Sequence, residues 1–208
     1  MVEVSTSILS VKKGEESQTF FALEKAHTDY FHIDVMDGNF VPDKKFPIEV
    51  LKDIKTINKK PLDVHLMVDN LEQVKKYALL KPEYLTFHVE ILEDYEIIDY
   101  IKSLGIKVGL AINPDTNVEL LIPYIDDIDM VLFMSVEPGK GGQTFKEEVI
   151  EKVKRLKEFA PSEVIISIDG GVNDKTISLC KYAGCDMVVS GSFVTNSLKY
   201  DDRINQLR

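Results

Sequence analysis

The sequence predicts an α/β fold of the (β/α)8 TIM-barrel class, and three observations carry this prediction. Eight short apolar segments alternate with eight segments that have the periodicity of amphipathic helices, and such alternation indicates a parallel sheet. The 208 residues give units of roughly 26 residues each, which suits a closed barrel near the lower end of its size range. Histidines, carboxylates and glycine turns gather where the strands end, as in barrel enzymes.

The strands are predicted from runs rich in β-branched and aromatic residues. They cover residues 2–9, 30–36, 61–67, 84–90, 106–112, 129–136, 163–169 and 186–191. The helices are predicted from apolar residues at helical spacing, clearest in 147–160, where Pro161 follows directly. They cover residues 15–27, 47–58, 70–80, 92–104, 116–123, 146–158, 175–182 and 199–206. An open doubly wound sheet fits less well, because the first turn lacks the GxGxxG pattern.

Composition narrows the class of protein further. A chain of 208 residues with 44% hydrophobic residues suits a single domain, 1–208. We expect a cytoplasmic protein without membrane association, because no apolar run reaches the length of a membrane span and the N-terminus lacks a secretion signal. A net charge of −10 argues against nucleic acid as a partner but permits a small anionic ligand. Cys180 and Cys185 are expected to be reduced, buried thiols.

Polar side chains lie near the ends of several predicted strands. The candidates are Ser7, His32, Asp34, Met36, His65, Met67, His88, Met134, Ser135 and Asp169. Alternation along 30–36 directs His32, Asp34 and Met36 to one face. Two imidazoles and two carboxylates, from His32, Asp34, His65 and Asp169, suit a divalent transition metal. The residues alone also permit separate, satisfied core or rim positions.

Three glycine-rich turns follow the last strands. They are EPGKGGQ (137–143), DGG (169–171) and SGS (190–192). Loops after the seventh and eighth strands of such barrels commonly bind phosphate, and the turn at 137–143 can also act as a mobile flap. The simpler alternative is that these glycines only permit tight turns. Met36, Met67 and Met134 either roof a site or fill gaps in the core.

Taken in order, several segments resemble ribulose-phosphate 3-epimerases. They are SILS (7–10), HIDVMDGNFVP (32–42), PLDVHLM (61–67), HVE (88–90), MSVEPGKGGQTF (134–145), IDGGV (168–172) and SGS (190–192). The resemblance spans nearly the whole chain, and the HxDxMDGxFVP and EPGxGGQxF blocks are its most specific parts. It implies a barrel of the ribulose-phosphate-binding type.

The resemblance also implies an activity and its residues. The activity is interconversion of D-ribulose 5-phosphate and D-xylulose 5-phosphate at C3, a step of the pentose phosphate pathway, by two-base proton transfer through an enediolate. Asp34 and Asp169 correspond to the acid/base pair, and His32, Asp34, His65 and Asp169 to the ligands of one divalent ion, first of all zinc, with iron, manganese or cobalt as alternatives. The implied substrate contacts are Ser7, His65, Met36, Met67, Met134, Gly139, Lys140, Gly141, Gly142, Gly170, Gly171, Gly191 and Ser192. We expect a phosphorylated ketose as the partner molecule and a homo-oligomeric state.

Departures from the family pattern leave alternatives open. They are Asn39, the loop DKKFPIE (43–49) and Asp115 in AINPDT (111–116), and they lie in loops that could change the sugar. A 3-epimerase of a related ketose phosphate, such as D-allulose 6-phosphate, is therefore an alternative, as is a non-catalytic sugar-phosphate-binding barrel. A decarboxylating barrel fits less well, because the stretch DVMD (34–37) lacks the lysine of the DxKxxD pattern. A Schiff-base aldolase would need a lysine at a strand end, and the predicted strands have none there.

Overall fold

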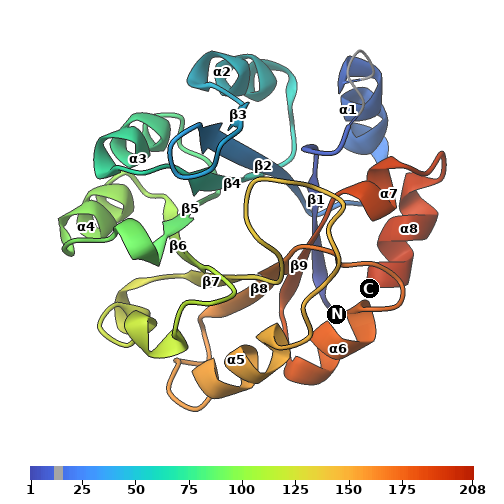
Figure 1. The fold of residues 1–208 in the computed structure, drawn as a ribbon. Helices are drawn as coiled ribbons and strands as arrows, with labels where there is room; N and C mark the ends of the chain where they lie inside the picture. The colour runs from blue at the N-terminus through green and yellow to red at the C-terminus, as the bar shows by residue number, and fades with distance from the viewer. Residues whose placement is uncertain (12–15) are drawn as a thin grey trace.

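The computed structural model describes residues 1–11 and 16–208, and within them all eight predicted strands are confirmed (Figure 1). The strands are β1 (Glu3–Ser7), β2 (Tyr30–Asp37), β4 (Leu62–Met67), β5 (Tyr84–His88), β6 (Lys107–Ile112), β7 (Met130–Met134), β8 (Ile165–Asp169) and β9 (Met187–Ser190). Each pairs in parallel with its neighbours in the order β1-β9-β8-β7-β6-β5-β4-β2, and β1 also pairs with β2. This last pairing closes the sheet, so the fold is a (β/α)8 barrel.

Helices surround the barrel on the outside (Figure 1). They are α1 (Glu16–Lys25), α2 (Ile48–Ile57), α3 (Leu71–Ala78), α4 (Glu96–Ser103), α5 (Val149–Leu156), α6 (Ile177–Ala183), α7 (Ser192–Thr195) and α8 (Tyr200–Leu207). The helix predicted over 15–27 is α1, although residue 15 lies outside the described residues. The helix predicted over 116–123 is wrong, because the chain forms only a 3-10 turn over Val118–Leu121. Pro123 lacks the N–H that a continuing α-helix needs there.

A short strand, β3 (Lys44–Lys45), was not predicted. It pairs antiparallel with the end of β2, matching Met36 with Lys45 and Asp37 with Lys44. Between them the chain turns back, and the Asp37 carboxylate accepts hydrogen bonds from the amides of Asn39 and Phe40. The unusual loop 43–49 is thus anchored to the strand that carries His32 and Asp34.

The two faces of the barrel strands differ in chemistry. Alternate side chains point outward and pack under the helices, and Phe31, Phe87 and Phe133 are all fully buried there. Burial of such a ring stabilises the fold by roughly 1.5–3 kcal/mol. The other side chains point inward, and the parallel register sets Asp34 beside His65. Alternation therefore brings polar groups from separate strands into the barrel interior.

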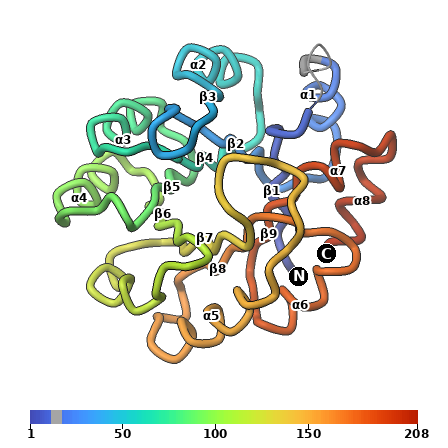
Figure 2. The backbone as a smooth tube through the Cα atoms, in the orientation of Figure 1, coloured from blue at the N-terminus to red at the C-terminus, as the bar shows by residue number. Residues whose placement is uncertain are grey.

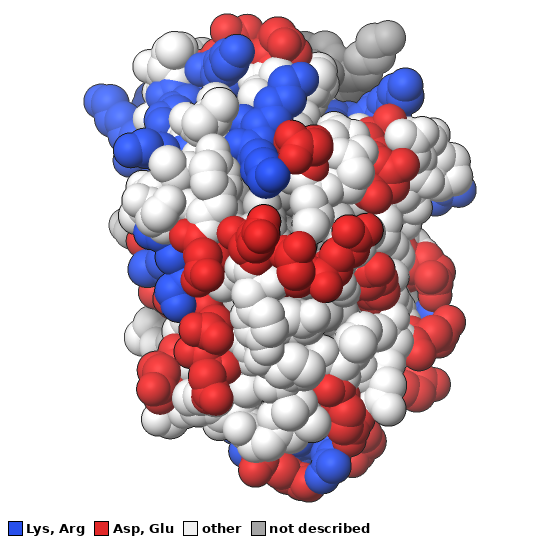
Figure 3. Space-filling model, turned by 90° about the vertical axis from the view of Figure 1, so that its left-hand side faces the viewer, with Lys and Arg blue, Asp and Glu red and all other residues white. Residues whose placement is uncertain are grey.

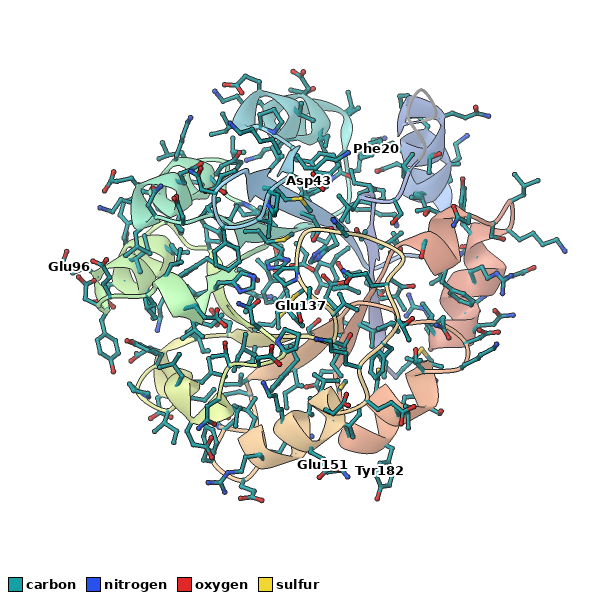
Figure 4. The ribbon with its side chains drawn as sticks, in the orientation of Figure 1. Phe20, Asp43, Glu96, Glu137, Glu151 and Tyr182 are labelled. Atoms are coloured by element: carbon teal, nitrogen blue, oxygen red, sulfur yellow. The ribbon has the colours of Figure 1, made fainter. Side chains whose placement is uncertain are left out.

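The loop after β7 crosses the open end of the barrel. Figure 2 shows this loop, drawn in yellow, passing in front of the strands before it reaches α5. Glu137 lies near the centre of the same view in Figure 4. The sequence stretch 137–143 is therefore placed over the carboxyl ends of the strands.

The surface carries its charges in separate groups. On the face in Figure 3, Lys and Arg gather toward one end, whereas Asp and Glu form a band across the middle.

Cys180 and Cys185 are both buried free thiols, as expected. In the described part of the chain, no helix combines the length and apolar character needed to cross a bilayer.

Candidate active site and metal centre

The four side chains proposed as metal ligands meet at the carboxyl ends of β2, β4 and β8. One ligand atom of each of His32, Asp34, His65 and Asp169 lies within 4.8 Å of the others. His32 Nε2 lies 3.2 Å from Asp34 Oδ1 and 3.8 Å from Asp169 Oδ2. His65 Nδ1 lies 3.4 Å from Asp34 Oδ1. The fold thus collects two imidazoles and two carboxylates from strands that are far apart in the sequence.

The orientation of His32 is fixed by Asp63, a residue that is not among the sequence-predicted candidates. His32 Nδ1 lies 2.7 Å from Asp63 Oδ2, and Asp63 also accepts a hydrogen bond of 2.8 Å from Ser5. All three side chains are fully buried. Burial alone would lower the pKa of His32, but the charges of Asp34 and Asp63 raise it well above its usual value. Strand alternation could have identified Asp63, since it shares the inward face of β4 with His65.

The orientation of His65 is fixed through a second histidine. His65 Nε2 lies 3.0 Å from His88 Nε2, and His88 Nδ1 lies 3.1 Å from Glu90 Oε2. Burial lowers the pKa of His88 to about 4. Burial opposes ionisation of Glu90, but hydrogen bonds from His88, Thr116 and Asn113 lower its pKa to about 2. His88 is one of the predicted strand-end candidates, whereas the sequence pattern does not single out Glu90.

The two carboxylates of the cluster have opposite pKa shifts. Burial alone would raise the pKa of Asp34, but His32 and His65 lower it well below its usual range. Ser7 also donates a hydrogen bond of 2.8 Å to Asp34 Oδ2. Burial, and then the negative charge of Asp34, raise the pKa of Asp169 to about 7. Near neutral pH the protein without a metal therefore holds one ionised carboxylate and one that is partly protonated.

The donor set fits a divalent transition metal. His65 Nδ1 is buried and has no hydrogen-bond partner among the described residues, although it faces Asp34. An unpaired buried nitrogen is unfavourable unless a ligand completes it. Imidazole nitrogens and carboxylate oxygens are ligands that zinc, iron, manganese and cobalt all accept. The fourth histidine, His27, lies elsewhere, on the surface, with its ring 3.0 Å from Asp201.

A cavity of about 400 Å³ opens above the cluster. Its walls include most of the residues predicted to contact substrate: Ser7, Met67, Met134, Gly139, Lys140, Gly141, Gly142, Gly170, Gly171, Gly191 and Ser192. Asp34 and Asp169 also line it, whereas His32 and His65 are fully buried below. Met36 is not part of the wall and instead packs with Met67 and Val41. The structure therefore brings the predicted residues together, with Met36 one layer behind.

Glycines let the cavity loops approach one another closely. At Gly171 (φ +62°), a Cβ atom would lie 2.6 Å from the backbone nitrogen of Phe145. At Gly141, a Cβ atom would collide with the hydroxyl of Ser10, which also lines the cavity. In the described part of the chain, the amides of Gly171 and Gly191 make no backbone-to-backbone hydrogen bond. They are available to an anion, because free backbone amides bind oxyanions.

Fold and site together define an enzyme of the (β/α)8-barrel class, with paired carboxylates at the base of a cavity that suits a small anionic molecule. Comparison with known proteins then gives the particular family. The chain belongs to the ribulose-phosphate 3-epimerase family, whose model matches residues 3–195. The resemblance drawn from the sequence is thereby confirmed, and the protein is an isomerase of the epimerase type.

Individual relatives match over nearly their whole length. The chain is 40% identical to a ribulose-phosphate 3-epimerase of Helicobacter pylori, covering 94% of this chain and 92% of the relative. It is 35% identical to the ribulose-phosphate 3-epimerase of Bacillus subtilis, covering 100% and 99%. Among solved structures, orotidine 5'-phosphate decarboxylase of Pyrococcus horikoshii has the same fold, with a TM-score of 0.69, 10% identity, and coverage of 98% and 96%.

Proposed function

We propose that this protein interconverts D-ribulose 5-phosphate and D-xylulose 5-phosphate by inverting the configuration at C3. The observation that carries the proposal is the convergence of His32, Asp34, His65 and Asp169 below the cavity. The names of relatives that match nearly the whole chain support the substrate class. We also propose that residues 1–208 form one barrel domain and that the protein is a homo-oligomer. We further propose that it acts in the cytoplasm, as the name of the rice relative states for that protein.

Two carboxylates from separate, non-adjacent strands support a two-base mechanism. Along the closed sheet, β1 and β9 separate β2 from β8 on one side, and four strands separate them on the other. Asp34 and Asp169 can therefore approach a flat enediolate from different faces. One carboxylate removes the C3 proton, and the other, in its protonated form, returns a proton to the opposite face. The lowered pKa of Asp34 and the pKa of Asp169, raised to about 7, support a resting state with Asp34 ionised and Asp169 protonated.

The residues His32, Asp34, His65 and Asp169 would hold one divalent ion, with zinc as our first choice and iron, manganese or cobalt as alternatives. Such an ion would stabilise the negative charge that develops on the sugar oxygens when the C3 proton leaves. Asp63 keeps a proton of His32 on Nδ1, so that Nε2 is the atom that would give up its proton and coordinate a metal ion. Ser7 holds Asp34 Oδ2 and leaves Oδ1 facing the two histidines.

The remaining cavity wall suits the sugar phosphate. The amides of Gly171 and Gly191, with the hydroxyl of Ser192, would bind the phosphate. Lys140, in the loop that crosses the mouth, adds a positive charge at the same cavity. Met67 and Met134 supply an apolar wall over the reacting carbons, which limits the access of water to the intermediate.

A direct assay tests the substrate and the metal together. The purified full-length protein is incubated with D-ribulose 5-phosphate and, separately, with D-allulose 6-phosphate, and epimerisation and C3 solvent exchange are followed by NMR. Metal content is measured on the same sample. We expect turnover of the pentose phosphate with about one divalent ion per chain. Turnover of only the hexose phosphate would replace our substrate, and binding without turnover of either would support a non-catalytic barrel.

A further inference from the structure

A line of hydrogen bonds leads from the proposed ligand His65 to the outside of the barrel. It passes from His65 Nε2 to His88 Nε2 over 3.0 Å, and from His88 Nδ1 to Glu90 Oε2 over 3.1 Å. Glu90 is held in turn by two donors at its other oxygen, Oε1: the amide of Asn113, at 2.9 Å, and the hydroxyl of Thr116. Five polar groups, which lie at or just after the ends of three neighbouring strands, are thus connected in one line.

The surroundings hold this line in place. Both histidine rings are fully buried, with their centroids 5.1 Å apart, and Phe40 packs on His88 with centroids 4.5 Å apart. The Glu90 side chain is 21% exposed. The loop that donates to Glu90 is itself fixed, because the ammonium of Lys152 on α5 donates to the carbonyls of Asn113, Pro114 and Thr116.

The donors at Glu90 determine where every proton of the line lies. A carboxylate only accepts, so His88 must carry its proton on Nδ1 and keep a lone pair on Nε2. That lone pair requires a donor opposite, which puts the proton of His65 on Nε2. In the neutral form of His65, Nδ1 is then left with a lone pair that faces Asp34 and the cluster. A metal ligand needs that state, because a protonated nitrogen cannot coordinate.

We propose that Glu90 and His88 are positioning residues that set the tautomer of His65 and so prepare its Nδ1 atom for a metal ion. The inference rests on the metal site of the proposed function. It differs from the support of His32, where Asp63 contacts the ligand directly. On this side of the site the carboxylate of Glu90 acts on His65 through His88. It is held by hydrogen bonds from Asn113 and Thr116, in the loop after β6.

The substitution Glu90→Gln reverses the line with almost no change of shape. Asn113 and Thr116 both donate to the position of Oε1, so the amide oxygen of the glutamine must take that position. Its NH₂ group then faces His88 Nδ1 and donates. His88 carries its proton on Nε2 and donates to His65 Nε2, which moves the proton of His65 onto Nδ1. The proton then points at Asp34 and blocks coordination.

The experiment measures tautomer and metal affinity on the chelator-stripped full-length protein. Imidazole ¹⁵N NMR without metal should show the Nε2–H form of His65 in the wild type and the Nδ1–H form in Glu90→Gln. Zinc affinity, measured by competition with a chromophoric chelator, should fall about 10- to 100-fold in Glu90→Gln. Thr116→Val, which removes one of the two donors at Oε1, should reduce zinc affinity by a smaller factor.

A matched control makes the same chemical change elsewhere. Asp129 accepts a hydrogen bond of 2.8 Å from the amide of Val108 at the other end of the barrel, and Asp129→Asn should leave both readouts unchanged. Zinc affinity of Glu90→Gln within twofold of the wild type would overturn the proposal. So would an Nδ1–H form of His65 in the wild type. If the wild type keeps the Nε2–H form but does not bind zinc, cobalt, iron or manganese, the proposed metal dependence fails while the tautomer control stands.

Discussion

Asp34 and Asp169 are the same residue type in one cluster, yet their surroundings differ. Asp34 is surrounded by polar groups: Ser7 donates to one carboxylate oxygen, and the rings of His32 and His65 lie beside the other. Asp169 has His32 Nε2 at 3.8 Å and a side chain that is 16% exposed at the cavity. The pKa of the first is lowered and that of the second is raised to about 7. The comparison teaches that the number of nearby donors, and not burial alone, decides which carboxylate is ionised.

The origin of the difference lies in the residues two positions earlier on each strand. On β2 the preceding inward residue is His32, which lies beside Asp34. On β8 the corresponding residue is Ser167, whose buried hydroxyl has no hydrogen-bond partner among the described residues. The preceding inward residue on each strand therefore contributes to the opposite pKa shifts of the two carboxylates.

The largest expected effect comes from removing either carboxylate. Asp34→Asn and Asp169→Asn should each lower kcat by about 10²–10⁴-fold or more, because a positioned acid/base group contributes that factor. Epimerisation of D-ribulose 5-phosphate and C3 exchange with solvent measure the loss. Asp186→Asn is a control, since that carboxylate binds the amide of Ile166 at the far end of the barrel. Near wild-type turnover in Asp169→Asn would show that the two-base assignment is wrong.

Removing the metal should have the next largest effect. Stripping the protein with a chelator should lower epimerisation at least about 100-fold, because charge stabilisation by a divalent ion is worth several kcal/mol. Addition of zinc, iron, manganese or cobalt should restore it, and the rates rank the ions. Full activity in the stripped protein would contradict this prediction and would show that the reaction does not require a metal ion.

In the metal-free protein, Asp34 and Asp169 should contribute to the free energy of unfolding with opposite dependence on pH. The pKa of Asp169 is about 7 in the folded protein and about 3.9 in the unfolded chain, so its contribution to stability is fully present below about pH 4 and is lost as the pH rises through 7. Asp34, with a lowered pKa, contributes above about pH 4, and this is lost as the pH falls. At pH 8 Asp169→Asn should therefore raise the free energy of unfolding, by up to about 4 kcal/mol, and Asp34→Asn should lower it. Urea unfolding in excess chelator measures both, and shifts in the same direction would contradict the assigned environments.

The sequence predicted those parts of the molecule that depend on local pattern. The eight strands follow from runs of β-forming residues, and strand alternation placed His32 and Asp34 on one face. Prediction of His65 and Asp169 in the same cluster needed only the rule that parallel strands end together. The fold and the four candidate ligands were therefore accessible from the sequence, whereas their roles still depend on the experiments above.

Other features depend on contacts between strands or on turns and were missed. Asp63 supports His32 only because the register sets β4 beside β2 at that point. Glu90 was read as part of a strand, but it lies in a 3-10 turn over Val89–Ile91, which turns its carboxylate back to His88. The pairing of Lys44 and Lys45 in β3 has no apolar pattern to reveal it. Alternation along the strand gives the face on which Asp63 lies, but the contact partners of Asp63, Glu90 and the two lysines follow only from the three-dimensional arrangement.

The smallest expected effect tests the donors around Asp34 directly. Ser7→Ala removes the hydrogen bond of 2.8 Å to Asp34 Oδ2, which should raise the pKa of Asp34 and lower kcat/KM about tenfold, since hydrogen bonds to charged groups are worth about 1.5–3 kcal/mol. Ser135→Ala is the matched change beside the other carboxylate, because the Ser135 hydroxyl donates to the main-chain carbonyl of Asp169 over 2.8 Å and not to its side chain. In the pH–rate profile the acidic limb should move to higher pH in Ser7→Ala and stay in place in Ser135→Ala. Equal movement of the limb in both variants would mean that the hydroxyl of Ser7 does not set the ionisation of Asp34, and the contrast between the two carboxylates would then rest on the histidines alone.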